Sequence, residues 1–179
     1  MEARNDLVIV RHAPAAHRGR LAGRRDVGLE PFDRERARER LAPMLEGLRP
    51  VASPARRCVE TAEAIWGTAP DTDPRLWEQD MGAWEGVAFA DLPDLGAMDP
   101  PTLAAHRPPG GESFDDLCTR TVPALREMAG CAIVAHAGTV RAALSMAVGP
   151  AALSFEVAPL SVTQLRLVPG GVSVVRVAA

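Results

Sequence analysis

The chain of 179 residues is 47% hydrophobic and 24% charged, which is ordinary for one globular domain with a sizeable core. Its formal charge of −3 argues against a sequence-independent nucleic-acid binder, because such proteins normally carry a basic excess. No apolar run in the sequence approaches the ~20 residues that cross a bilayer, and its first residues do not resemble a signal peptide. The three cysteines form no Cys-x-x-Cys pair, as is typical of reduced thiols. We therefore expect a single cytoplasmic domain over residues 1–179 that binds neither nucleic acid nor membrane.

Short apolar runs alternate with amphipathic stretches along the chain, which predicts an α/β fold. The expected elements are, in chain order, a strand at 6–10, a helix at 33–48, a strand at 50–53, a helix at 54–66, a helix at 113–128, a strand at 131–135, a helix at 139–148 and two or three strands within 153–179. The three early strands have the composition of strands buried in a parallel sheet. The sequence thus predicts a mainly parallel sheet covered by helices on both faces.

Local signals set the expected element ends. Ser53 followed by Pro54 is typical of an N-cap with proline at the first helical position. The Ser-x-x-acid spacing that begins at Ser113 predicts a capping box. The segments 19–31 and 67–111, rich in Gly, Arg, Pro or Asp, are expected to be loops with at most short elements.

Cationic and imidazole side chains follow each of the three early strands. The first strand runs into Arg11-His12, the second into Arg56-Arg57 and the third into His136. Because ligands in open parallel sheets sit outside the carboxyl ends of the strands, these residues should surround one crevice. Guanidinium groups match phosphate oxygens bidentately, and an imidazole among them can attack phosphorus. A single such histidine or arginine is more often structural, but their joint placement favours an anion site.

Five short segments of the chain carry a family resemblance. They are Val-Arg-His-Ala at 10–13, Ser-Pro-Ala-Arg-Arg-Cys-Val-Glu-Thr-Ala at 53–62, Glu-Gln-Asp-Met-Gly-Ala-Trp-Glu-Gly at 78–86, Gly-Gly-Glu-Ser at 110–113 and His-Ala-Gly-Thr-Val-Arg at 136–141. Together they resemble the signatures of the histidine phosphatase superfamily, whose fold is phosphoglycerate mutase-like. The resemblance covers nearly the whole chain and implies a three-layer α/β/α sandwich with a mostly parallel central sheet.

The resemblance implies a role for each matching residue. His12 would attack phosphorus and become phosphohistidine, while Arg11, Arg57 and His136 would bind the phosphoryl oxygens. It singles out Arg57, and not its neighbour Arg56, as the phosphate ligand. Glu78 would protonate the leaving oxygen and then deprotonate the water that hydrolyses the phosphoenzyme. The implied enzyme is a metal-independent phosphomonoesterase without a cofactor, acting on a small phosphorylated substrate.

Some positions depart from the family pattern. Ala13 replaces the family glycine, which the backbone tolerates where φ is negative. The family asparagine is missing, so that His17 or Arg18 would contact phosphate instead. Mutases of the family place a tyrosine where this chain has Met81, and the sequence contains no tyrosine. These departures favour a phosphatase over a phosphoglycerate mutase.

The leaving-group side is the least patterned part of the sequence. The Gly-Arg-rich loop at 19–26 resembles the α-ribazole phosphatase-like branch, which implies α-ribazole 5′-phosphate as one candidate substrate. Candidate substrate-pocket residues are His17, Arg18, Arg24 and Trp84.

Three alternative functions remain open at this stage. One is a phosphoglycerate mutase-type phosphoryl transfer, and a second is a non-catalytic phosphate-binding module. The third is a metallohydrolase, although the sequence lacks the short His-x-His or His-x-x-x-His spacing of such sites.

Overall fold

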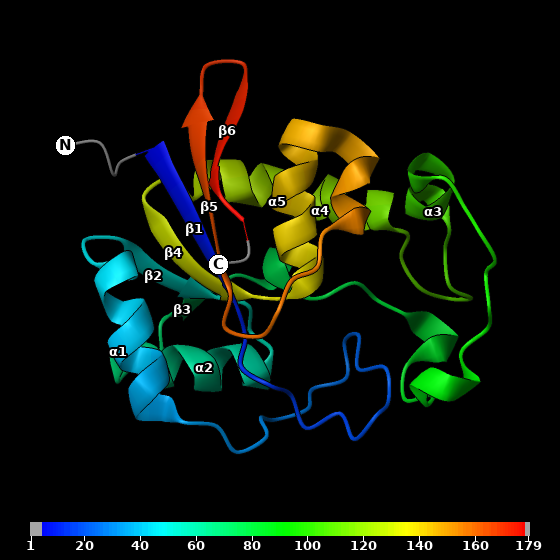
Figure 1. Cartoon of the computed structure of the whole chain (residues 1–179), viewed down its shortest axis with the longest axis horizontal. Coiled ribbons are helices and arrows are strands. Elements are labelled where there is room, and N and C mark those ends of the chain that lie inside the picture. Colours follow the sequence, from blue (N-terminus) through cyan, green and yellow to red (C-terminus); the bar gives the residue numbers. More distant parts are fainter. Residues whose placement is uncertain (1–4, 178–179) are drawn as a thin grey trace.

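A computed structural model describes residues 5–177 of the chain, with six strands joined into one sheet in the order β3-β2-β4-β1-β5-β6 (Figure 1). The strands are β1 Asp6–Arg11, β2 Arg49–Ala52, β3 Asp71–Thr72, β4 Cys131–Ala135, β5 Val162–Val168 and β6 Gly171–Arg176. The α-helices are α1 Arg34–Leu45, α2 Arg56–Trp66, α3 Pro100–Ala105, α4 Phe114–Glu127 and α5 Ala137–Val148. Short 3₁₀ turns occupy Pro74–Leu76, Gly82–Trp84, Phe89–Asp91 and Gly149–Ser154.

Four neighbouring strands of the sheet, β3, β2, β4 and β1, run parallel, whereas β5 and β6 run antiparallel to their neighbours. Arg11 pairs with Ala135 and Ala52 pairs with Val134, so β1, β4 and β2 end side by side. The chain therefore leaves all three strands at one edge of the sheet. This arrangement confirms the predicted mostly parallel sheet and brings the three strand exits together.

Alternate residues of β1 enter two separate hydrophobic cores. Leu7 and Ile9 pack into the core that contains the buried residues of α4 and α5. Val8 and Val10 pack into the other core, beneath α1 and α2. Figure 1 shows these two helix pairs on opposite sides of the sheet. The predicted α/β/α layers are thus confirmed, and burial on both faces explains the continuous apolar runs of the strands.

Several predicted helix ends were wrong. Helix α2 begins at Arg56 with Ala55 as its N-cap, so Ser53 is not the N-cap. The Ser53 hydroxyl oxygen instead accepts from the Ala55 N–H at 3.3 Å and contacts His136 at 2.8 Å. Helix α5 begins two residues earlier than expected, with His136 at the N-cap. Helix α1 ends at Leu45, so the predicted stretch to residue 48 is too long.

Other local expectations were correct. Ser113 and Asp116 form the predicted capping box at the start of α4. The chain ends in a β5–β6 hairpin whose turn falls at Pro169 and Gly170. Among the described residues, no helix is long and apolar enough to cross a membrane.

Candidate active site

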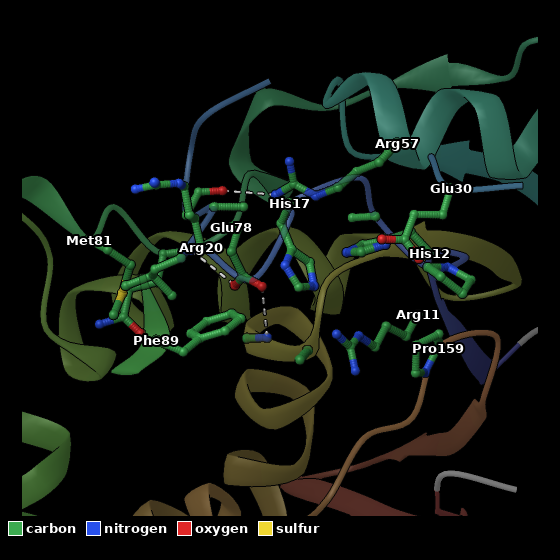
Figure 2. A pocket seen from close by; sticks show the side chains of 18 of the residues that line it. Arg11, His12, His17, Arg20, Glu30, Arg57, Glu78, Met81, Phe89 and Pro159 are labelled. Atoms are coloured by element: carbon green, nitrogen blue, oxygen red, sulfur yellow. Dashed lines mark hydrogen bonds between the residues drawn. The ribbon is translucent and has the colours of Figure 1, made fainter. Parts of the chain in front are cut away.

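A cavity of about 330 Å³ lies at the edge of the sheet where β1 and β4 end. Figure 2 shows Arg57, Glu78, Arg11 and His12 around one central space, with the ring of His17 among them. These side chains come from the end of β1, the loop after it, the start of α2 and the segment after Leu76. The cavity therefore gathers residues from segments that lie far apart in the sequence.

His12 is held in one tautomer by the backbone. Its side chain is 5% exposed, and Nδ1 lies 2.7 Å from the carbonyl oxygen of Ala13. Because a carbonyl only accepts hydrogen bonds, Nδ1 carries the proton and Nε2 keeps its lone pair. Burial, reinforced by the nearby Arg57 and Arg11 charges, lowers the pKa of His12 to about 3 despite the opposing bond to Ala13. At neutral pH the ring is therefore uncharged, with a free nitrogen.

Arg57 is a buried cation, held by the backbone of another loop. Its guanidinium donates from Nη1 to the carbonyl of Arg25 at 2.9 Å and from Nη2 to that of Gly23 at 2.8 Å. No carboxylate pairs with it among the described residues. The loop after β1 thus fixes the orientation of this guanidinium and leaves its charge uncompensated within the cavity wall.

Arg11 is a second cation that lines the cavity. Its Nη1 donates to the carbonyl of Val157, while its buried Nε has no hydrogen-bond partner among the described residues. Burial lowers the pKa of Arg11, and the nearby Glu78 carboxylate partly offsets that effect. A buried N–H group without a hydrogen-bond partner costs free energy, and an anion in the cavity that accepts from Arg11 Nε would remove this cost.

His136 is fully buried and does not line the cavity. Arg57 Nη2 lies 3.2 Å from its Nδ1, and its Nε2 lies 2.8 Å from the hydroxyl of Ser53. Since a guanidinium only donates, Nδ1 accepts and Nε2 carries the proton. Burial and then the Arg57 charge lower the pKa of His136 well below its usual range. Its ring also meets that of His12 edge to face, with centroids 5.4 Å apart.

Glu78 reaches the cavity because Gly138 has no side chain. Glu78 Oε2 accepts from the Gly138 N–H at 3.4 Å, and Oε1 accepts from the Gln79 N–H at 3.0 Å (Figure 2). A Cβ on Gly138 would meet Glu78 Oε1 at 2.1 Å and Leu117 Cδ2 at 2.9 Å. The first turn of α5 thus supplies both a donor and the room for this carboxylate.

The backbone around Glu78 is held by an ion pair between Arg120 of α4 and Glu112, which precedes this helix. Arg120 and Glu112 form a bidentate pair at 2.9 and 3.0 Å, and Arg120 also donates to the Glu78 carbonyl at 2.9 Å. Burial alone would raise the pKa of Glu112, but hydrogen bonds from Arg120 and from the Asp80 N–H outweigh it and lower the pKa. The half-buried Arg120–Glu112 ion pair therefore holds the backbone of the segment that carries Glu78.

Of the four residues predicted to line the substrate pocket, one lines the cavity and the other three lie elsewhere. His17 lines the cavity, and its Nδ1 accepts from the Gly19 N–H, so its Nε2–H is the remaining donor. Arg18 lines only a neighbouring recess. Arg24 does not line the cavity but pairs with Glu112 at 2.9 Å, and Trp84 stacks on His106.

Two arginines that line the cavity were absent from the predicted site. Arg20 and Arg141 both line it, and each uses part of its guanidinium on a carbonyl, of Gly86 and of Phe155 respectively. Arg141 follows His136 by five residues on α5, so the helical position was readable from the sequence. Arg20 had no such signal, because the loop path that brings it there depends on contacts with the segment 86–89.

The comparisons with known proteins decide the family. The profile of the Histidine phosphatase superfamily (branch 1) matches residues 7–179. The chain belongs to this superfamily. The family resemblance inferred from the five segments is therefore confirmed, without an assignment to the α-ribazole branch.

Individual histidine phosphatase relatives are more distant. Over 82 residues the chain is 42% identical to the bifunctional protein Rv2228c of Mycobacterium tuberculosis, which covers 39% of this chain and only 21% of that protein. It is 29% identical over 170 residues to glucosyl-3-phosphoglycerate phosphatase of Mycolicibacterium vanbaalenii, covering 80% of this chain and 74% of that protein. The crystal structure of TTHB049 from Thermus thermophilus matches with a TM-score of 0.76 at 31% identity, covering 97% of this chain and 99% of that chain.

His, Cys, Asp and Glu are the side chains that most often bind metal ions in proteins. Within residues 5–177, no three of these residues lie together in a way that could hold a metal ion. The three cysteines, Cys58, Cys118 and Cys131, are free thiols.

Proposed function

We propose that this histidine phosphatase hydrolyses small phosphomonoesters through a phosphohistidine on His12. The observation that carries the proposal is the fixed tautomer of His12, which leaves Nε2 as an uncharged nucleophile in a cavity with two carboxylate-free guanidiniums. A neutral imidazole is required for attack, and the low pKa of His12 keeps it neutral at physiological pH.

In the first step, the Nε2 lone pair forms a bond to phosphorus while the bond from phosphorus to the ester oxygen breaks. The leaving oxygen takes the electron pair and a proton from the Glu78 carboxyl group. In the second step, Glu78 removes a proton from water as it attacks the phosphohistidine, which releases inorganic phosphate and restores the His12 lone pair. Atoms and charges balance over the two steps with water as the only co-reactant.

Arg11 and Arg57 bind the equatorial oxygens of the transferring phosphoryl group. Their fixed hydrogen bonds to the backbone pre-organise both charges, which is the largest expected contribution in phosphoryl transfer. His136 supports Arg57 and packs against His12. A direct bond from His136 to a phosphoryl oxygen requires its Nε2–H to leave the Ser53 hydroxyl.

The substrate is proposed at the level of a phosphorylated metabolite. Two candidates have support from different sources: α-ribazole 5′-phosphate from the loop resemblance at 19–26, and glucosyl-3-phosphoglycerate from the relative of that activity. Mutase-type transfer remains a second candidate, since it shares the phosphohistidine step. Release of free phosphate without a bisphosphate primer separates the two activities.

The test is a screen of phosphomonoesters, both candidates included, with free phosphate as the readout. We expect turnover that survives exhaustive chelation and that vanadate inhibits by occupying the anion site. Loss of turnover in EDTA, restored by zinc or magnesium, would instead favour the metallohydrolase alternative. Absence of phosphate release from every ester, p-nitrophenyl phosphate included, would favour a non-catalytic binding module.

A further inference from the structure

The loop after β1 forms a second recess beside the catalytic cavity. This recess of about 380 Å³ shares His17, Arg20, Leu21 and Ala22 with the cavity and extends toward Arg18 and Arg25. Among the described residues that line it, three are arginines, one is histidine and none is acidic. The recess therefore adjoins the catalytic cavity, and Arg20 lines both of them.

The arginines that line the recess form no ion pairs with the described residues. Other arginines of the chain pair with nearby acids, as Arg56 does with Glu60 and Arg75 with Asp73. Among residues 5–177, no carboxylate lies within ion-pair distance of Arg18, Arg20 or Arg25. Two acids of the adjoining segments hold backbone groups, since Glu85 accepts from the Arg24 and Met81 N–H groups and Asp26 accepts from the Arg56 N–H. Glu30 lines the adjoining cavity but not the recess.

Backbone hydrogen bonds hold Arg20 at the boundary between the cavity and the recess. Its backbone bridges to Ala88, and on either side Leu21 N–H donates to the Val87 carbonyl and Phe89 N–H donates to the Gly19 carbonyl. Its Nη1 donates to Gly86, which leaves the other guanidinium N–H groups without a hydrogen-bond partner in the described part of the chain. The Arg20 side chain is exposed, but its bond to Gly86 restricts it and so lowers the conformational entropy lost when it binds an anion.

We infer that the recess is a second anion subsite, and that the preferred substrates carry a carboxylate or second phosphate besides the phosphoryl group at His12. This inference rests on the proposed function and deepens it, because it names the class of leaving group. The phosphoryl group would lie on Arg11 and Arg57, and the second anion on Arg20, with Arg25 and Arg18 further along the recess.

The experiment compares esters that differ only in the second charge. We would measure kcat/KM for a series of ω-phosphooxy alkanoates of three to six carbons and for their primary amides, which have the same shape but no second charge. A parallel arm uses the α,ω-alkanediol bisphosphates of equal length. The series is needed because the best chain length reports the span between the two subsites.

We expect the wild-type protein to favour the carboxylate over the amide by roughly 10-fold or more at one chain length, as is typical of a hydrogen bond to a charged group. Arg20→Gln should bring that ratio close to one, and Arg25→Gln should lower it less. Arg126→Gln, which removes an exposed arginine at the far end of α4, is the matched control and should leave the ratio as in wild type. A larger preference for bisphosphates than for carboxylates identifies phosphate as the second anion.

Two results would overturn the inference. One is a carboxylate-to-amide ratio near one at every length in the wild type, and the other is an unchanged ratio in Arg20→Gln. Turnover of p-nitrophenyl phosphate through a phosphoenzyme, together with either result, leaves the proposed function intact and removes the second subsite alone. No turnover of any ester overturns the proposed function, and the subsite with it.

Discussion

The two ends of the cavity are built differently. The proposed phosphoryl end consists of Arg11, His12 and Arg57, with the buried His136 behind Arg57. These residues lie at the ends of strands or in the first turn of a helix and are held by backbone or side-chain hydrogen bonds. The leaving-group end is formed by two segments. One is the loop after β1, which includes the exposed Arg20, and the other is the segment 78–89, which includes the exposed Phe89.

This difference separates chemistry from selectivity. Groups that act on phosphorus must be oriented whatever the substrate, and strand ends supply that rigidity. Groups that meet the leaving group sit on loops, where substitutions alter the pocket without disturbing the sheet. Variants at the phosphoryl end should therefore slow all substrates alike, whereas variants at the leaving-group end should change the ranking of substrates.

Replacing the nucleophile is the strongest test of the phosphoryl end. His12→Ala should lose about 10³-fold or more in turnover on every ester. Among the described residues, His17 is the one other histidine that lines the cavity, and it cannot replace His12 because its Nδ1 accepts from the Gly19 N–H and its Nε2 carries the proton. The intermediate should be an acid-labile, base-stable phosphoenzyme, measured with ³²P-labelled substrate. Similar turnover in His12→Ala and wild type, with the protein folded by circular dichroism, would refute the mechanism.

Replacing the acid should distinguish the two ends most clearly. Glu78→Gln should reduce kcat/KM on alkyl phosphates by ~10²–10⁴-fold, the usual contribution of a general acid, and affect p-nitrophenyl phosphate far less. The reason is that p-nitrophenolate leaves without needing a proton. Single-turnover formation of the phosphoenzyme should be followed, so that slow hydrolysis does not mask the first step.

The matched control for this experiment is Arg57→Gln, which acts on the phosphoryl group and should slow both substrates by similar factors. Equal losses on both substrates in Glu78→Gln would mean that another residue is the acid. Asp80 and Glu85 in the same segment would then be the next residues to test, although Glu85 already accepts two backbone N–H groups.

Glu78 can also be displaced without being changed. In Gly138→Ala the added methyl group would lie 2.1 Å from Glu78 Oε1, so the carboxylate must leave its place beside residue 138. We expect at least a 10-fold loss on alkyl phosphates and a smaller loss on p-nitrophenyl phosphate, as a weaker copy of Glu78→Gln. Gly171→Ala is the control, because a Cβ there meets open space. Equal losses on both esters would show that Gly138 does not act through Glu78.

The sequence predicted the phosphoryl end better than the leaving-group end. Apolar runs located β1 and β4, and their ends led directly to His12 and His136 because a strand exit is a local feature. The approach of Glu78 to Gly138 joins residues 60 positions apart, and no local pattern reports such a contact. Ser53 illustrates the same limit: its local context favoured a helix cap, but tertiary contact with His136 determined its place.

The buried histidines of the phosphoryl end should also make the fold sensitive to acid. The pKa of His12 is lowered to about 3 and that of His136 well below its usual range, both chiefly by burial, whereas an unfolded histidine titrates near 6.5. Between these values the unfolded chain binds more protons than the native one, so the stability falls as the pH drops below about 6.5. His12 should cost about 1.4 kcal/mol at pH 5.5 relative to pH 7.5, and His136 should add a loss of stability in the same direction.

This prediction is checked by urea unfolding at pH 7.5, 6.5 and 5.5, compared between wild type and His12→Gln. The variant should lose less stability over this range, because one of the two buried histidines no longer titrates. Carboxylates with lowered pKa values, such as Asp6 beside Arg166, contribute only at more acidic pH and so do not obscure the comparison. Identical pH slopes in the two proteins would show that the His12 imidazole is protonated as readily in the native state as in the unfolded chain, and that the neutral nucleophile needs another explanation.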